Sequence, residues 1–249
     1  MASAAAMEII HEEEIVYPES DGEPMADNTR QFRWIVTIQG GLDALFQENP
    51  QVFVAGNIFW YPVQGRPDIR RAPDVLVAFG RPKGDRGSYL QWKEEDIAPQ
   101  VVFEILSPGN TIKEMFEKFE FYDTYGVQEY YLYDPDRNDL SGWLRTDDCL
   151  QIIAMMDGWV SPRLGIQFDF SQGELQIYRP DGQRFATYVE LEQQREQEQQ
   201  RAEQEHQRAE QEHQRAEYQY KRAERMALKL REMGIDPAEY LVDDDEQQA

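Results

Sequence analysis

The sequence has little of the chemistry on which many enzymes depend, histidine and cysteine above all. Its only histidines are His11, His206 and His213, and Cys149 is its one cysteine. A single cysteine permits neither an internal disulfide nor a cysteine metal cluster, as is usual in a reducing compartment. The three histidines lie outside the predicted folded core. This argues against a serine triad, a Cys–His nucleophile pair and a histidine-rich zinc site.

Two further absences narrow the function. The sequence has no Gly-x-x-x-x-Gly-Lys-Ser/Thr loop and no Gly-x-Gly-x-x-Gly motif after a strand, which are the usual phosphate-binding loops. No run approaches the roughly 20 apolar residues that cross a bilayer. Residues 1–7 lack the basic end and apolar core of a signal peptide, and acids follow them. We therefore expect a cytoplasmic protein that uses carboxylates, lysine and a bound ion.

Basic charge is scarce. The net charge is -23. Residues 191–249 hold 16 acidic and 9 basic residues, a net charge of -7, which leaves -16 for the rest of the chain. Proteins that bind nucleic acid usually carry a basic surface, because neutralising phosphates supplies most of their affinity. Cleavage of DNA by this chain would therefore need a local basic patch and bound metal ions.

Hydrophobic patterning divides the chain into an acidic, irregular segment at 1–27, a folded domain at 28–190 and a charged tail at 191–249. A helix is predicted to begin at Asn28 or Thr29, although Gly40 and Gly41 weaken its middle. A second is predicted to follow Asn110, because Thr111 and Glu114 have the spacing of a capping box. Its apolar face is made of Ile112, Met115, Phe116, Phe119 and Tyr122. Strands are predicted at 52–55, 58–61, 74–79, 101–106 and 129–133. This order predicts an α+β fold in which helices flank a central mixed sheet.

The charged tail is an internal repeat with a period of seven residues. Arg-Ala-Glu-Gln-Glu-His-Gln stands at 201–207 and again at 208–214. The period is typical of a coiled coil and would allow a homodimer. However, the two heptad positions that would form the interface between helices are poorly suited to it. One position holds alanines, and the other holds mainly histidine and tyrosine. A lone charged helix held by pairs such as Arg201 with Glu205 is an equal alternative.

Two acids stand where a strand should be buried. Glu104 lies in the run Val101–Leu106, which is apolar on both faces and therefore predicts a central strand. A carboxylate there costs several kcal/mol unless it is paired or bound to a metal. Alternatively, Glu104 marks the open end of the strand. Asp74 begins another strand after Pro73, where a simple turn cap is the alternative. On neighbouring strands the two acids would form an oxygen site suited to Mg²⁺ or Mn²⁺.

An ordered set of motifs resembles a known family. The motifs are Pro73-Asp74-Val75, the run from Val102 to Pro108, the run from Lys118 to Tyr122, the run from Tyr125 to Tyr131, and Asp134-Pro135. Together they resemble the Uma-two family of restriction endonucleases, which belongs to the PD-(D/E)xK nuclease superfamily. The resemblance covers about residues 15–190. It implies a restriction-endonuclease-like core that hydrolyses DNA phosphodiester bonds with Mg²⁺ or Mn²⁺.

The resemblance also implies roles for individual residues. Asp74 and Glu104 match the metal-binding acids, and Glu23 could add a ligand from the N-terminal segment. The superfamily's lysine would stand two residues after Glu104, where this chain has Leu106. Lys118 on the following helix matches the lysine that has migrated in this family, and it would orient the attacking water or offset charge on the phosphate. The alternative is an ordinary surface lysine whose stem lies on the core.

Contacts to DNA would come from local bases, all of them before the second predicted helix. They are Arg30, Arg33, Arg66, Arg70, Arg71, Arg81, Lys83 and Arg86. If these residues cluster around the opening of one site, they would form a groove that contacts the phosphate backbone. If they are scattered, they would be ordinary solvated surface residues. A different class of function remains open: a catalytically silent nuclease-like fold that binds a protein through its acidic surface and C-terminal helix. A basic channel leading to the two acids would favour cleavage, and an acidic rim would favour binding.

Overall fold

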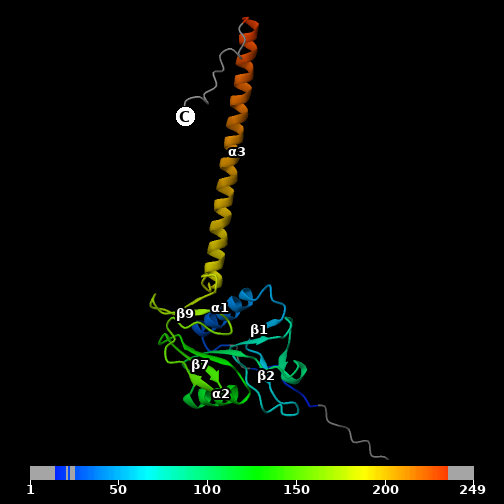
Figure 1. The fold of residues 1–249 in the computed structure, drawn as a ribbon, viewed down its shortest axis with the longest axis vertical. Helices are drawn as coiled ribbons and strands as arrows, with labels where there is room; N and C mark the ends of the chain where they lie inside the picture. The colour runs from blue at the N-terminus through cyan, green and yellow to red at the C-terminus, as the bar shows by residue number, and fades with distance from the viewer. Residues whose placement is uncertain (1–14, 21, 23–25, 235–249) are drawn as a thin grey trace, which may run out of the picture. The chain divides into compact units, whose positions relative to one another are not determined.

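A computed structural model describes residues 15–20, 22 and 26–234. The chain divides between Tyr188 and Val189 into two units, a folded unit and a helical unit. The elements follow in the order α1 (Thr29–Leu45), β1 (Val52–Gly56), β2 (Phe59–Tyr61), β3 (Val75–Phe79), β4 (Ser88–Leu90), the 3₁₀ turn η1 (Gln91–Lys93), β5 (Val101–Ile105), α2 (Ile112–Thr124), β6 (Glu129–Asp134), β7 (Asp139–Thr146), β8 (Cys149–Ile152), β9 (Gln167–Asp169), β10 (Gln176–Tyr178) and α3 (Tyr188–Glu232) (Figure 1).

The folded unit is built on a six-stranded mixed sheet with the strand order β1-β3-β5-β6-β7-β8. Strands β5 and β6 are parallel, and the other neighbours in this sheet are antiparallel. A parallel pair needs a long crossover connection, and α2 is that crossover. Two smaller sheets pair β2 with β4 and β9 with β10. The predicted α+β fold with a central mixed sheet and flanking helices is confirmed.

The central strands bury both faces, because their side chains alternate between two cores. Val75 and Val77 of β3 pack in one core with Ile35 of α1. Leu76 of β3 packs in the other core with Tyr122 of α2. Figure 1 shows α1 and α2 on opposite sides of the sheet, in agreement with this division. The alternation determines which side chains of β3 and β5 face α2.

Helix α1 begins where the sequence predicts, and its two glycines do not end it. Asn28 is the N-cap, and its side chain accepts hydrogen bonds from the backbone N–H groups of Arg30 and Gln31. At Gly41 a Cβ atom would lie 2.4 Å from the ring of Phe185, whereas at Gly40 it would meet nothing within 4 Å. Gly41 therefore lets Phe185 pack directly against the helix backbone.

Helix α2 is capped as predicted, but its apolar face is only partly buried. The Thr111 hydroxyl accepts a hydrogen bond from the backbone N–H of Glu114. Tyr122 is fully buried, whereas the side chains of Ile112 and Phe116 are 91% and 57% exposed. The predicted apolar face is therefore buried toward its C-terminal end and exposed in the first two turns. Those turns instead border an apolar groove of about 760 Å³ that also includes Trp143 of β7.

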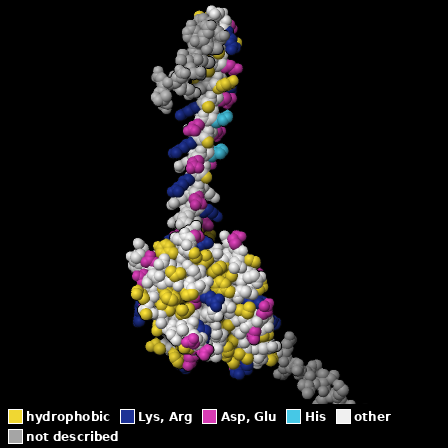
Figure 2. Space-filling view, viewed as in Figure 1, with side chains coloured by type: hydrophobic (Ala, Val, Ile, Leu, Met, Phe, Trp, Pro, Cys, Tyr) yellow, Lys and Arg dark blue, Asp and Glu magenta, His cyan; other side chains and the backbone are white. Residues whose placement is uncertain are grey.

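The described part of the helical unit consists almost entirely of α3, a 45-residue helix that begins at Tyr188 and has no buried residue. Ion pairs within it include Glu192 with Arg195 and Glu217 with Lys221. Figure 2 shows acidic and basic side chains interleaved along the helix. The homodimer through its heptads stays a prediction. Among the described residues, no helix is both long and apolar enough to span a membrane.

Candidate active site

Asp74 and Glu104 lie opposite each other on neighbouring strands. In the antiparallel pair of β3 and β5, Val75 faces Phe103, so the next residue outward, Asp74, stands opposite Glu104. Side-chain alternation directs both acids toward α2. They are 7% and 2% exposed. The Asp74 Oδ2 atom accepts a hydrogen bond of 2.7 Å from the backbone N–H of Ile105, which fixes the carboxylate against β5.

Helix α2 supplies a partner to each oxygen of Glu104. Lys118 Nζ donates to Glu104 Oε2 at 2.8 Å, and the Tyr122 hydroxyl donates to Glu104 Oε1. Lys118 and Tyr122 are four residues apart and therefore lie on the same side of the helix. The structure thus brings together the three predicted site residues and adds Tyr122. The sequence predicts Tyr122 only as part of the apolar face of this helix. Its spacing of four residues from Lys118 is the pattern that indicates a shared side and therefore a shared site.

The electrostatics of the cluster favour an additional positive charge. Burial, and then the charge of Glu104, raise the pKa of Asp74 well above its usual value, although Ile105 N–H and Lys118 oppose the shift. Burial lowers the pKa of Lys118, but the carboxylates of Glu104 and Asp74 outweigh it, and the net pKa is raised. Lys118 is therefore protonated at neutral pH. Two buried carboxyl groups thus face a single ammonium group, that of Lys118.

A buried hydroxyl lies close to the same two acids. Burial, then Glu104 and Asp74, raise the pKa of the Tyr130 phenol well above its usual value. Within the part of the chain that the structure describes, this hydroxyl has no hydrogen-bond partner. Buried polar atoms are rarely left unpaired. An unpaired hydroxyl beside two carboxylates fits a site that takes water or an ion.

A pocket of about 540 Å³ gives access to the cluster, and Asp74 and Lys118 are among its walls. Its lining is mixed in charge: the bases are Arg70, Arg71 and Lys118, and the acids are Asp27, Asp68, Asp74 and Glu114. The rim is therefore neither the continuous basic channel nor the purely acidic surface that would separate the two functional hypotheses. Two of the eight predicted DNA-contacting bases, Arg70 and Arg71, do reach this pocket.

Most of the eight bases are paired with carboxylates. The pairs are Arg30 with Asp136, Arg66 with Asp68, Arg71 with Glu117, Arg81 with Glu94 and Glu95, Lys83 with Asp43, and Arg86 with Glu94. For the other two, Arg33 and Arg70, the described residues provide no ion pair. A basic surface made of all eight residues is thus not formed.

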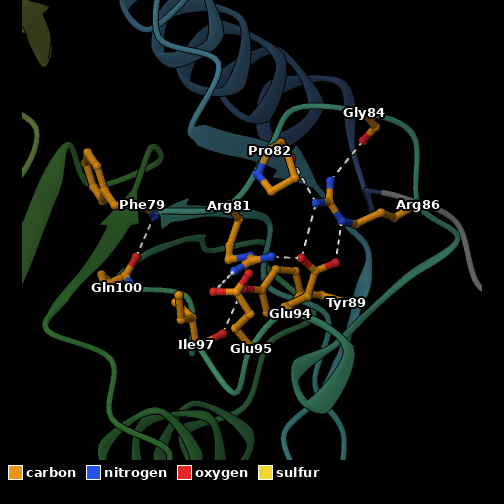
Figure 3. Close-up of polar contacts among 10 residues, drawn as sticks. All are labelled: Phe79, Arg81, Pro82, Gly84, Arg86, Tyr89, Glu94, Glu95, Ile97 and Gln100. Atoms are coloured by element: carbon orange, nitrogen blue, oxygen red, sulfur yellow. Dashed lines mark hydrogen bonds and ion pairs between the residues drawn. The ribbon is translucent and has the colours of Figure 1, made fainter.

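Arg81 and Arg86 belong to a buried ion cluster (Figure 3). Glu94 accepts from Arg81 Nε at 3.1 Å and from Arg86 Nε at 2.6 Å. Arg81 and Glu94 are 7% and 9% exposed, and the Arg86 guanidinium lies 3.9 Å from the centre of the Phe53 ring. These two arginines stabilise the β3–β5 connection. Both are engaged with carboxylates, so neither is the freely solvated surface residue of the second sequence-based alternative.

Glu23 falls outside the described residues. His206 and His213 are on α3, and Cys149 is exposed on β8. Across residues 15–20, 22 and 26–234, no group of three or more His, Cys, Asp or Glu side chains could hold a metal ion. Of the acids near this pocket, Asp74 and Glu104 are the pair that stand opposite each other on β3 and β5.

The chain is similar to a known protein family and to solved structures. Residues 6–171 match the Uma2 family, described as "Putative restriction endonuclease". A crystal structure described as a "putative nuclease belonging to DUF820" from Anabaena variabilis is 15% identical, with a TM-score of 0.40, and the alignment covers 54% of this chain and 72% of that chain. No curated protein matches. Because the family match covers two thirds of the sequence, the chain belongs to the Uma2 family of restriction-endonuclease-like nucleases.

Proposed function

We propose that the chain is a Mg²⁺-dependent endonuclease that hydrolyses DNA phosphodiester bonds at the Asp74–Glu104 cluster. Its family supports a nuclease in general terms. The observation that supports the finer assignment is a buried pair of carboxyl groups, Asp74 just before β3 and Glu104 on β5, with Lys118 of α2 bonded to Glu104. A fold does not need two facing acids in a buried sheet, and keeping them there costs stability. Such an arrangement is typical of a functional site.

The residues fit a hard divalent cation. Asp74 and Glu104 would hold Mg²⁺ or Mn²⁺ through carboxylate oxygens, the donors that these ions prefer. Mg²⁺ commonly uses one or two carboxylates and keeps several waters, so the site does not require a third acid. When bound, the ion would supply Lewis-acid activation of the phosphate and a lowered pKa for the attacking water. The raised pKa of Asp74 and the unpaired Tyr130 hydroxyl both support this fit.

The chain's own groups would position the reactants and balance charge. Lys118 is held as a cation by Glu104 and so cannot serve as a general base at neutral pH. Its role in the proposal is to offset negative charge that develops on the phosphate oxygens. Tyr122 would orient Glu104 through the second oxygen. Leu106 lines the apolar groove, so the ammonium group comes from α2 and not from β5.

One observation favours the alternative of a silent fold that binds a protein partner. Six of the eight predicted DNA-contacting bases are paired with carboxylates, which leaves few cations for a phosphate backbone. The acidic surface and α3 would then be the interacting parts. We place this second, because partner binding does not require Asp74, Glu104 and Lys118 to meet at a pocket.

Plasmid cleavage in Mg²⁺ or Mn²⁺ at low salt tests the proposal. The variants are Asp74→Asn, Glu104→Gln and Lys118→Met, and the matched control is Lys113→Met, which removes an 86% exposed lysine from the same helix. Each site variant should lower the rate at least about a hundredfold, the effect of deleting one charge-stabilising group. The control should cut like the parent. If the parent and all four variants behave alike on several DNA substrates, the endonuclease proposal is wrong.

A further inference from the structure

Arg70 is the cation in the pocket whose role is still unassigned. It lies between β2 and β3 and lines the same pocket as Asp74 and Lys118. Its position is fixed by two contacts. The guanidinium carbon lies 4.8 Å from the centre of the Phe59 ring, and Nη1 donates to the carbonyl oxygen of Pro67 at 2.8 Å. The side chain is half-buried. The head group is therefore held in place before any ligand arrives.

The charge of Arg70 has no carboxylate partner among the described residues, although four acids line the pocket. Its neighbour Arg71 reaches Glu117 at 3.5 Å, and Arg66 forms an ion pair with Asp68 at 2.6 Å. The guanidinium of Arg70 is held in place without an ion pair, and it lines the same pocket as the protonated Lys118. This arrangement favours the binding of an anionic group. Besides the hydrogen bond to Pro67, the guanidinium interacts with the hydroxyl of Tyr61. The remaining N–H donors of the five are enough for a bidentate contact.

We propose that Arg70 binds a phosphate of the DNA backbone beside the bond that is cut. The inference rests on the proposed function and extends it, since it names the residue that seats the substrate. The planar guanidinium can donate two parallel hydrogen bonds to the non-bridging oxygens of one phosphate, which a lysine cannot do. Arg70 thus sets the position of the strand in the pocket, while Asp74 and Glu104 remain on the reacting side.

The salt dependence of binding tests this assignment. The full chain is titrated with a fluorescent duplex oligonucleotide in Ca²⁺, and anisotropy is followed over a range of salt concentrations. Each phosphate contact on duplex DNA adds about 0.9 to the slope of log affinity against log salt. For a fourfold rise in salt, the parent should therefore lose about 3.5-fold more affinity than Arg70→Ala. Arg70→Lys should keep the parent's slope, because the positive charge is kept. It should bind DNA more weakly, because lysine cannot donate two parallel hydrogen bonds to one phosphate.

Arg33→Ala is the matched control. Like Arg70, Arg33 has no ion pair within the described part of the chain, but it is exposed on α1 and does not line the pocket. It should keep the parent's slope, and thermal melting should show that all variants are folded. If the parent cuts plasmid DNA but Arg70→Ala keeps the parent's slope and affinity, this inference alone is overturned. If the parent neither binds nor cuts DNA, the proposed function falls and the inference falls with it.

Discussion

Replacing Asp74 by asparagine should stabilise the metal-free protein and abolish cleavage. In the folded chain the Asp74 carboxylate is 7% exposed and faces Glu104. Burial and the charge of Glu104 raise its pKa, so the ionised form opposes folding. An asparagine keeps an oxygen to accept from Ile105 N–H, and its amide can donate to Glu104. A repulsive contact is thereby exchanged for an attractive one.

The size of the gain follows from the same contacts. Each unit by which folding raises a carboxyl pKa corresponds to about 1.4 kcal/mol lost when the group is ionised. Relief of such strain by one substitution commonly yields about 0.5–2 kcal/mol. For a domain of this length, about 1 kcal/mol shifts the melting temperature by roughly 2–4 °C. We therefore expect Asp74→Asn to melt about 1–8 °C above the parent at neutral pH in EDTA.

The pH dependence has a definite sign. Below about pH 3.9 the Asp74 carboxyl is protonated in both the folded and unfolded chains, so its ionisation does not lower the free energy of unfolding of the parent there. As the pH rises, the unfolded chain releases its proton first, and the stability of the parent falls until the raised folded pKa of Asp74 is passed. Asparagine does not titrate. The difference between variant and parent should therefore widen from acid toward neutral pH.

Thermal unfolding followed by circular dichroism in EDTA, at several pH values, measures this difference. Adding Mg²⁺ should then raise the melting temperature of the parent more than that of the variant, because the ion binds the folded state. The reasoning would be refuted if Asp74→Asn melted below the parent at neutral pH in EDTA. It would also be refuted if the difference were the same at acid and neutral pH.

Two further predictions concern stability and can be checked by urea unfolding. Glu94→Gln should cost about 3 kcal/mol, because it removes the buried carboxylate shared by Arg81 and Arg86 and leaves Arg81 only the exposed Glu95. Asp136→Asn, which breaks an exposed pair, should cost under about 1 kcal/mol. If the two variants lost equal free energy of unfolding, the buried position of the Arg81–Glu94 pair would be contradicted. Gly41→Ala should destabilise by about 1–3 kcal/mol, because its Cβ would meet the Phe185 ring. Gly40→Ala, in open space, should be neutral or stabilise by up to about 1 kcal/mol, and the opposite order would refute the packing.

Local patterns were sufficient to predict the elements that carry the site. The alternation around Glu104 predicts a central strand with the acid turned away from Phe103 and Ile105, and the structure has this arrangement. The cap at Thr111 was predicted from side-chain spacing alone. These features depend on contacts within a few residues, so a single sequence contains them.

Non-local contacts decide the rest. That Asp74 stands opposite Glu104 depends on the register of β3 against β5, which no local pattern specifies. Arg81 and Arg86 were candidates for DNA contact because nothing nearby in sequence shows that both meet Glu94 in the interior. The exposed Ile112 shows the same limit, since helical spacing groups apolar residues without telling which of them find a partner.

The placement of Lys118 and Tyr122 on α2 also bears on how the site assembles during folding. Their contacts with Glu104 span 14 and 18 residues of chain, whereas the contact between Asp74 and Ile105 spans 31. Closing a shorter loop costs less conformational entropy, so near contacts tend to form earlier. The contacts of Glu104 lie within the β5–α2–β6 unit, whereas Asp74 joins the site through the pairing of β3 with β5. We therefore expect Lys118 and Tyr122 to meet Glu104 before the second carboxylate is in place.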